Sequence, residues 1–312
     1  MTGAAGFIGS HLSERLLSLG YQVWGIDNLD PFYDPEIKKR NLGLLERNSS
    51  FRFFFGDIRD KTFLEKLLSE NSFLKVIHLA AKAGVRPSVQ NPLEYEEVNI
   101  RGTLNLLETL KKRKTGQFIF ASSSSVYGAN QKVPFSEADP VDQPVSPYAA
   151  TKRAGELFCF NYSYLYGIPT TCLRFFTVYG PRQRPEMAIS TFARSIWEER
   201  PLLVYGDGTV QRDFTFIEDI VDGVIRASEK IFPFEIFNLG GSDTHSIKRV
   251  IGLLSSCLGK KAIVQYLPGQ AGDMAITSAD IKKAREQLGY SPKTTLEQGL
   301  EIVCKEIKNG KH

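Results

Sequence analysis

The sequence predicts an α/β protein with a doubly wound parallel sheet, followed by a smaller C-terminal α/β region. Short β-rich runs alternate with amphipathic helical stretches in the first half, a glycine-rich turn opens the chain, and prolines break the pattern after Gly180. Strands that alternate with helices form βαβ units, whose parallel sheet is covered on both faces. We expect a first domain over residues 1–180, to which a segment near 213–242 returns, and a second formed mainly by residues 181–312.

The composition fits this class. The 312 residues are 42% hydrophobic and 24% charged, which is enough apolar material for a large core. A net charge of +4 is too weak and too dispersed for a nucleic-acid surface. No apolar run approaches the ~18 residues of a membrane span. We therefore expect neither nucleic acid nor a membrane as a partner.

Each expected strand is a short apolar run. The strands are expected at residues 21–27, 51–57, 75–81, 117–122 and 170–176. Helical patterns occupy residues 10–19, 93–112, 147–166, 279–288 and 296–307. The four cysteines lie far apart without a CxxC pair, which favours free thiols in a reducing, cytoplasmic compartment. The four histidines show no metal-binding spacing, so no metal is expected.

The glycine-rich turn TGAAGFIG places Gly3, Gly6 and Gly9 before a helix. Such a turn lets the backbone approach a pyrophosphate, and the helix N-terminus supplies N–H donors. Asp27 ends the next strand, 18 residues after Gly9, near the ~20 expected for a carboxylate on an adenosine ribose. It would accept from a free 2′-hydroxyl and repel a 2′-phosphate, which favours NAD over NADP. The alternative is a purely structural turn.

The strand that should precede this turn is not visible in the sequence. Only Met1 and Thr2 come before Gly3, so we expect the central first strand to be truncated. A parallel sheet without its middle strand leaves unpaired backbone groups on two neighbours. A truncated, unstable or inactive chain therefore stays open as an alternative.

Tyr148 and Lys152 form a YxxxK pair on one face of an expected helix. A tyrosine near pKa 10 is a poor base, but an adjacent ammonium lowers the pKa and lets the pair act as general base and acid. The pattern is common on surface helices. It gains weight from the serines of SSSSVYG, residues 122–128, at the end of a strand, where α/β sites lie.

These motifs, in this order, resemble the extended short-chain dehydrogenase/reductase family, and within it the nucleotide-sugar 4-epimerases. The resemblance rests on TGAAGFIGSH, Asp57, LAA at residues 79–81, Asn99, SSSSVYG, YAATK and LRFFTVYGPRQRP. It implies a Rossmann-type domain, NAD as the cofactor, and a catalytic triad of Ser123, Tyr148 and Lys152. It further implies a cofactor path lined by Gly3, Gly6, Phe7, Ile8, Gly9, Asp27, Asn28, Asp57, Ile58, Leu79, Ala80, Ala81, Lys82, Asn99, Ser122 and Phe175.

Several members of this family oxidise a sugar at C4 in their first step. Dehydratases then carry an Asp-Glu pair after the catalytic Thr, and decarboxylases carry a nearby Glu, because their second steps need extra acid or base groups. Ser124 and Ser125 occupy these positions here. This disfavours dehydration and, less strongly, decarboxylation. The remaining reaction is 4-epimerisation, in which hydride returns to the other face of the ketone.

Several features resemble epimerases that act on UDP-glucuronate. They are Thr177 in LRFFT, Arg184 in GPRQRP, the loop 27–34, and Arg86 in GVRPS. Arg184 offers a planar fork that suits a carboxylate, with Thr177, Ser124 and Ser125 as hydroxyl donors. Alternatively, Arg184 faces solvent or contacts phosphate. The resemblance also places Arg212 on the pyrophosphate and Asp273 on a uridine ribose; surface salt bridges are the alternative for both.

Three other hypotheses stay open at this point. They are a UDP-glucose or UDP-N-acetylglucosamine 4-epimerase, a non-catalytic NAD-sensing module, and an inactive truncated family member. The resemblance also implies a homodimer that pairs the helices near residues 93–112 and 147–166. The second helix carries four aromatic residues, more than one face needs against a sheet, although these could pack on the sheet alone.

Overall fold

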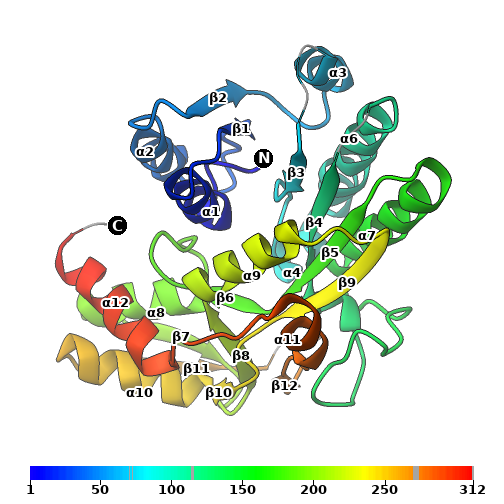
Figure 1. The fold of residues 1–312 in the computed structure, drawn as a ribbon. Helices are drawn as coiled ribbons and strands as arrows, with labels where there is room; N and C mark the ends of the chain where they lie inside the picture. Colours follow the sequence, from blue (N-terminus) through cyan, green and yellow to red (C-terminus); the bar gives the residue numbers. More distant parts are fainter. Residues whose placement is uncertain (70, 72, 114–115, 270–273, 311–312) are drawn as a thin grey trace.

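The computed structural model describes residues 1–312 except 70, 72, 114–115, 270–273 and 311–312. Its first half alternates strands and helices, which confirms the predicted α/β class (Figure 1). The elements are α1 Phe7–Ser18, β1 Val23–Asp27, α2 Pro35–Leu45, β2 Phe51–Phe55, α3 Lys61–Ser69, β3 Lys75–His78, α4 Val85–Gln90, α5 Pro92–Glu96, η1 Glu97–Arg101, α6 Gly102–Leu110, β4 Gln117–Ser123, η2 Ser124–Tyr127, α7 Pro147–Tyr166 and β5 Thr170–Phe175.

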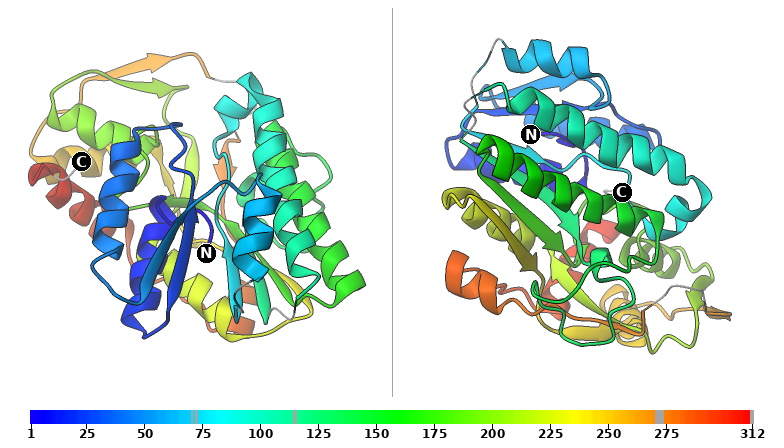
Figure 2. Two further views of the ribbon diagram at one scale, coloured as in Figure 1. Left: turned by 90° about the horizontal axis from the view of Figure 1, so that it is seen from above. Right: turned by 90° about the vertical axis from the view of Figure 1, so that its right-hand side faces the viewer.

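Parallel strands form the main sheet. Four of them run in the order β3-β4-β5-β9, with β9 at Phe234–Leu239, and β1 pairs in parallel with β2. Helices α1 and α9 (Ile217–Glu229) pack together on one side, while α3, α6 and α7 form the other layer (Figure 2). Helices on both faces explain why the central strand β4 is buried at every position.

One residue, Thr2, joins β1 to β3. It forms parallel bridges to Ile26 and to His78, at the place where we expected the central first strand to be truncated. The Thr2 N–H donates to the Ile77 carbonyl at 3.0 Å, and the Thr2 carbonyl accepts from Leu79 N–H at 3.2 Å. Beside it, the Met1 carbonyl accepts from Ile26 N–H at 2.8 Å. These bonds fix the start of the glycine-rich turn between the two strands.

A buried chain of hydrogen bonds runs from this junction to the opposite helix layer. Thr103 Oγ1 donates to the Asn99 carbonyl at 2.6 Å, so it must accept from His78 Nε2 at 3.0 Å. His78 Nδ1 therefore accepts from Thr2 Oγ1 at 2.7 Å. Burial lowers the pKa of His78 to about 3, which keeps the ring neutral.

The stretch 93–112, expected as one helix, is three consecutive segments. The wider π-helical turn η1 separates α5 from α6 and carries Asn99. Two hydrogen bonds of the Asn99 side-chain amide account for the wider turn. Oδ1 accepts from Lys82 N–H at 2.8 Å, and Nδ2 donates to the Lys82 carbonyl at 2.9 Å. A π-turn of this kind re-aims a side chain, and here it aims the amide at the loop after β3.

The C-terminal half adds two smaller sheets. Strand β8 pairs with β6, β10 and β12, while β7 pairs with β11. The elements are β6 Thr177–Tyr179, α8 Ala188–Trp197, β7 Leu202–Tyr205, β8 Gln211–Phe216, β10 Thr244–Ser246, α10 Ile247–Leu258, β11 Val264–Leu267, β12 Ile276–Thr277, α11 Lys282–Leu288 and α12 Leu296–Lys308. Within the segment 213–242, α9 packs on α1 and β9 pairs with β5 in the main sheet, whereas β8 stays with the smaller sheet. The division into two domains stays a prediction.

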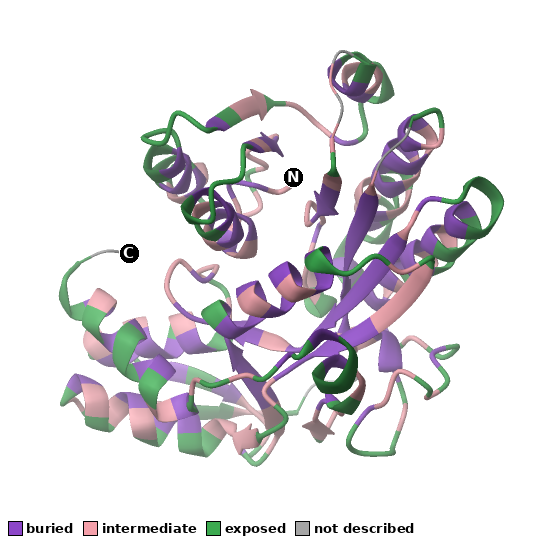
Figure 3. Cartoon of the chain, in the orientation of Figure 1, coloured by how far each residue is buried: buried purple, intermediate pink, exposed green. Residues whose placement is uncertain are grey.

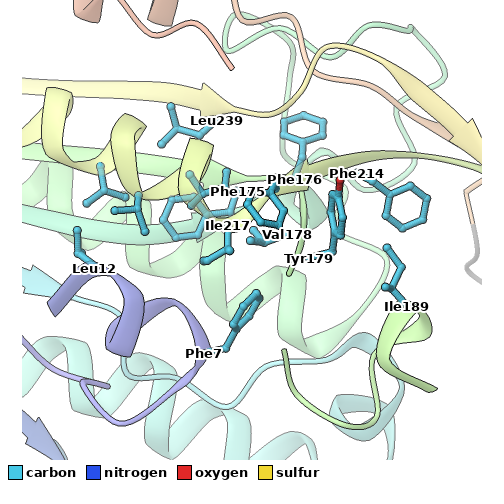
Figure 4. Close-up of a cluster of buried hydrophobic side chains, with 14 of the residues drawn as sticks. Phe7, Leu12, Phe175, Phe176, Val178, Tyr179, Ile189, Phe214, Ile217 and Leu239 are labelled. Atoms are coloured by element: carbon cyan, nitrogen blue, oxygen red, sulfur yellow. The ribbon is translucent and has the colours of Figure 1, made fainter. Parts of the chain in front are cut away.

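The largest apolar cluster spans both halves. In Figure 4, Phe7 and Leu12 of α1 lie near Phe175 of β5, and the cluster continues through Tyr179 to Ile189 on α8. Figure 3 shows the burial concentrated in β4, β5 and the inner faces of the helices. Because this core is shared, the edges of the two sheets are held at a fixed separation. Among the described residues, no helix is long and apolar enough to cross a membrane.

Candidate functional site

A cleft of about 490 Å³ lies where the main sheet meets the C-terminal half. It runs along the carboxyl ends of the parallel strands, where ligands of open α/β sheets bind. The structure brings most of the sequence-predicted site residues to its wall. They are Gly3, Gly6, Phe7, Ile8, Gly9, Asp27, Asn28, Asp57, Ile58, Leu79, Ala80, Ala81, Lys82, Ser122, Ser123, Ser124, Ser125, Tyr148, Lys152, Phe175, Thr177 and Arg184.

The glycine-rich turn forms one end of the cleft and has no room for side chains. Gly3 has φ +71°, and a Cβ on Gly9 would lie 2.0 Å from the Gly3 carbonyl oxygen. Helix α1 then begins at Phe7 with no side-chain cap and no acidic residue in its first turn. Its first N–H groups and the positive end of its dipole suit a phosphate.

Asp27 lies at the end of β1, and it is only 7% exposed. One carboxylate oxygen accepts from Ala5 N–H at 3.1 Å and the other from Leu29 N–H at 2.9 Å. Burial raises the pKa of Asp27, which the Lys38 ammonium, 4.0 Å away, opposes. Each oxygen keeps a second lone pair, so the carboxylate can also accept from ribose hydroxyls.

Asp57 follows β2 and is held by two neighbours. Arg59 pairs with it at 2.8 Å, and Asn28 Nδ2 donates to it at 2.9 Å. Burial alone would raise the pKa of Asp57, but the hydrogen bonds from Arg59 and Asn28 lower it below its usual value. The result is an ionised, oriented acceptor beside Ile58, at the side of the cleft where the resemblance places an adenine.

The loop 27–34, which sequence reasoning singled out only as a whole, and helix α2 contribute further cleft residues. Asp30, Phe32, Tyr33 and Lys38 line the cleft. Lys82 Nζ pairs with Asp30 at 2.9 Å and with Glu94 at 2.7 Å, which ties this loop to α5. The two adjacent aromatics of this loop, a few residues after Asp27, were the available signal for individual roles.

Ser123 and Tyr148 meet in the middle of the cleft, at the end of β4 and in the first turn of α7. Burial raises the pKa of Tyr148, while its hydrogen bond with Ser123 and the charge of Arg184 lower it. Ser146 caps α7 by accepting from Ala149 N–H at 3.1 Å, and Pro147 begins the helix. The cap and the proline fix the turn that presents the Tyr148 phenol.

Lys152 lies one turn further along α7 and is 5% exposed. We expected its ammonium to lower the pKa of Tyr148. Instead, Lys152 Nζ donates to the Ala121 carbonyl at 2.7 Å, and the pKa of Tyr148 stays above its usual value. Burial lowers the pKa of Lys152 itself to about 8. The lysine is therefore a buried donor at the floor of the cleft.

A buried ion pair supports this floor from below. Glu156, on the next turn of α7, accepts from Ser122 Oγ at 2.6 Å. Arg174 of β5 donates to both oxygens of Glu156, at 2.8 and 2.9 Å. The three side chains lock α7 to two strands and so fix the spacing of Ser123, Tyr148 and Lys152.

Three hydroxyls and one guanidinium also line the cleft, and we call these residues, Ser124, Ser125, Thr177 and Arg184, its far wall. Ser124, Ser125 and Thr177 are half-buried there. The Arg184 guanidinium pairs with Glu186 at 3.1 Å, donates to the Ala83 carbonyl at 3.4 Å, and lies 5.9 Å from the centre of the Phe32 ring. Its side chain is 20% exposed and lines the cleft, in contrast to the alternative in which Arg184 faces bulk solvent.

Three predicted site residues do not line the described cleft. Asn99 lies behind it, where its side chain bonds to the Lys82 backbone and to Thr151 Oγ1. Arg86 stacks 4.3 Å from the centre of the Tyr205 ring, and Arg212 Nη1 donates to the Met274 carbonyl at 2.7 Å. Long-range contacts of this kind leave no local sequence signal. Asp273 lies outside the described residues.

Known proteins with similar sequences agree with this geometry. The chain matches the GDP-mannose 4,6-dehydratase family over residues 1–303. A UDP-glucuronate 4-epimerase of Thermodesulfobacterium geofontis is 45% identical over 302 residues, covering 96% of this chain and 93% of that protein.

Similar solved structures belong to the same kind of enzyme. The UDP-glucuronic acid 4-epimerase of Bacillus cereus, in complex with UDP-glucuronic acid and NAD, is 42% identical, with a TM-score of 0.92 and coverage of 99% and 98%. The UDP-glucose 4-epimerase of Thermotoga maritima is 32% identical, with a TM-score of 0.91 and coverage of 100% and 98%. The predicted family is confirmed: the chain belongs to the extended short-chain dehydrogenase/reductases, in the branch that contains GDP-mannose 4,6-dehydratase and the nucleotide-sugar 4-epimerases.

Proposed function

We propose that this protein is an NAD-dependent epimerase that interconverts UDP-glucuronate and UDP-galacturonate at C4. The observation that carries the proposal is the composition of the cleft. A phosphate-binding turn and ribose-binding acid occupy one end, a Ser–Tyr–Lys set lies in the middle, and hydroxyls with one guanidinium form the far wall. The T. geofontis and B. cereus relatives carry this activity in their names.

The residues of the cleft fit NAD. The Gly3–Gly9 turn and the N-terminus of α1 would hold the pyrophosphate, Asp27 the adenosine ribose hydroxyls, and Asp57 with Ile58 the adenine side. The Asp27 carboxylate would repel a 2′-phosphate, which favours NAD over NADP. Bound NAD would accept a hydride from sugar C4 and return it.

The protein's own part in the reaction is proton transfer and orientation. Tyr148 removes the proton from the C4 hydroxyl and later returns one to the 4-keto oxygen, while Ser123 bonds that same oxygen. Burial raises the pKa of Tyr148, so its phenolate, once formed, is a strong base. Lys152 orients the ribose next to the reacting centre and supplies a buried positive charge.

The cleft favours epimerisation over elimination of water. Of the described residues, the acids that line it are Asp27, Asp30 and Asp57, and each is bonded within the dinucleotide end. Dehydration needs a further acid and base at the sugar, where this chain has Ser124 and Ser125. These hydroxyls do not titrate near neutrality.

The far wall suits a uronic acid. A 4-keto uronate is a β-keto acid, which loses CO2 when its carboxylate bond aligns with the carbonyl π system. Arg184 offers a bidentate fork, and Thr177 and Ser125 offer short donors that would hold the carboxylate out of that alignment. UDP-glucose is the second candidate, because the T. maritima UDP-glucose 4-epimerase has nearly the same backbone.

A homodimer fits the outer surface of α7. Leu157, Phe160 and Tyr164 follow a helical spacing on its outside and are 52%, 50% and 79% exposed. Leu93 on α5, which contacts α7, is 78% exposed. Aromatic and aliphatic side chains exposed in this number mark a protein interface. The four free cysteines fit a reducing, cytoplasmic compartment.

The proposed mechanism is tested in deuterated water. Incubation with NAD and UDP-glucuronate should produce UDP-galacturonate that keeps its protium at C4, because the same hydride returns. The Tyr148→Phe protein, which lacks the phenolic hydroxyl, is the matched control and should form product at least about 100-fold more slowly. Deuterium at C4, or UDP-xylose as the product, would contradict the proposal.

A further inference from the structure

Tyr95 lies directly behind the catalytic phenol without reaching the cleft. It lies on α5, is 1% exposed, and is absent from the described residues that line the cleft. Its ring meets the Tyr148 ring edge to face, with 6.2 Å between centroids and 82° between planes. Edge-to-face pairs of this geometry are attractive beyond the area that they bury. Tyr95 therefore forms a wall against which the Tyr148 ring rests.

The hydroxyl of Tyr95 makes a second contact. It donates to the Ala83 carbonyl at 2.9 Å. That same carbonyl accepts from Arg184 Nη1 at 3.4 Å, and a carbonyl oxygen has two lone pairs to serve both donors. Burial raises the pKa of Tyr95 to about 12, so it stays a neutral donor throughout the working pH range.

The loop between these groups is itself held in place. Lys82, next to Ala83, has both main-chain polar groups bonded to Asn99, at 2.8 and 2.9 Å. Gly84 follows with φ +113°, a conformation that strains other residues. A carbonyl fixed on both sides transmits the position of the Tyr95 hydroxyl to the Arg184 guanidinium.

We propose that Tyr95 is a positioning residue for both halves of the reaction: its ring orients Tyr148, and its hydroxyl, through the Ala83 carbonyl, orients Arg184 for the substrate carboxylate. The Arg184 half rests on the function proposed above. The two halves are separable, because Tyr95→Phe removes only the hydroxyl, whereas Tyr95→Leu removes the aromatic ring as well.

Steady-state kinetics on UDP-glucuronate and UDP-glucose, measured against pH, test the two halves. Tyr95→Phe should raise KM for UDP-glucuronate about 2- to 12-fold, the range of one hydrogen bond, with kcat and its pH profile unchanged. KM for UDP-glucose should stay the same. Tyr290→Phe is the matched control, because Tyr290 is fully buried and its hydroxyl also donates to a carbonyl, that of Gly240, at 3.1 Å.

Tyr95→Leu should lower kcat about 2- to 12-fold on any substrate, as expected for the loss of one aromatic pair. It should also move the acidic limb of the kcat profile to lower pH, because water reaching Tyr148 relieves the burial that raises its pKa. Tyr95→Phe keeps the ring and should retain the wild-type limb. A purely structural role would lower kcat without moving that limb.

Each negative result would overturn a different part of the proposal. An unchanged limb in Tyr95→Leu would overturn the Tyr148 half, and equal KM changes on both sugars in Tyr95→Phe would overturn the Arg184 half. A wild-type enzyme that turns over only neutral sugars would refute the proposed substrate and the Arg184 half together. The pH profile on that neutral sugar would still decide the Tyr148 half.

Discussion

Replacing Arg184 with methionine should change which sugar the enzyme prefers. Arg184 lines the described cleft beside Phe32, close enough to the Ser–Tyr–Lys set for its charge to act on Tyr148. Methionine keeps an unbranched apolar stem but removes the charge and the fork. A hydrogen bond to a charged group contributes about 1.5–3 kcal/mol, so kcat/KM for UDP-glucuronate should fall about 10- to 150-fold.

The structure places the expected loss in the lower part of that range. The Arg184 side chain is 20% exposed and already pairs with Glu186 at 3.1 Å, so part of its charge is screened before any substrate binds. For UDP-glucose, which has no carboxylate, kcat/KM should change less than about threefold, the scale of one exposed ion pair.

Removing Arg184 should also change the pH dependence on both sugars. The guanidinium lowers the pKa of Tyr148, so its loss raises that pKa further. Because the deprotonated phenol is the base, the acidic limb of kcat/KM should move to higher pH. Arg184→Lys, which keeps the charge without the fork, should retain the limb while losing part of the selectivity.

The assay is the initial rate of product formation for each UDP-sugar, followed by proton NMR across a series of pH values. Equal losses on the acidic and neutral sugars would refute the carboxylate assignment. A limb that stays in place in Arg184→Met would refute the electrostatic link to Tyr148.

Three further predictions follow from the same contacts. Tyr148→Phe should lower kcat by about 10²- to 10⁴-fold while NAD binding, measured by calorimetry, stays within a factor of two, since Asp27 and the glycine turn remain. Burial lowers the pKa of His78 from its usual 6.5 to about 3, so its stabilising contribution is present above pH 6.5 and is lost as pH falls towards 3. From pH 7 to pH 5 this group should lower the free energy of unfolding by about 2 kcal/mol, a loss that urea titrations should not find in His78→Gln. Phe160→Glu should yield a monomer by light scattering, because it places a charge on the outer face of α7; an unchanged dimer mass would remove α7 from the interface.

Much of the fold was predictable because its signals are local. The Gly3–Gly9 turn, Asp27 at a strand end and the run before Ser122 each read directly as a turn, an acid and a buried strand. The strands at β3, β4 and β5 are apolar because helices cover both faces of the sheet. The π-turn at η1 was missed because it is only five residues long and contains no glycine or proline that would mark it in the sequence.

The site was less predictable where a side chain has two chemically similar options. Sequence spacing places Lys152 one turn from Tyr148, but it does not say that the ammonium turns to the Ala121 carbonyl. It also does not show that Arg86 stacks on Tyr205 while Arg184 faces the cleft. These choices depend on residues between 31 and 119 positions away, so they appear only when the chain has folded.

The most direct test of the account is one NMR time course with competing substrates. The protein and NAD are mixed with equal amounts of UDP-glucuronate, UDP-glucose and UDP-N-acetylglucosamine, and the anomeric signals are followed. The account predicts that UDP-galacturonate grows first and alone. Growth of a neutral galacto-sugar in its place would contradict the role of Thr177 and Arg184 at the far wall, and no growth of any product would contradict the proposed epimerisation itself.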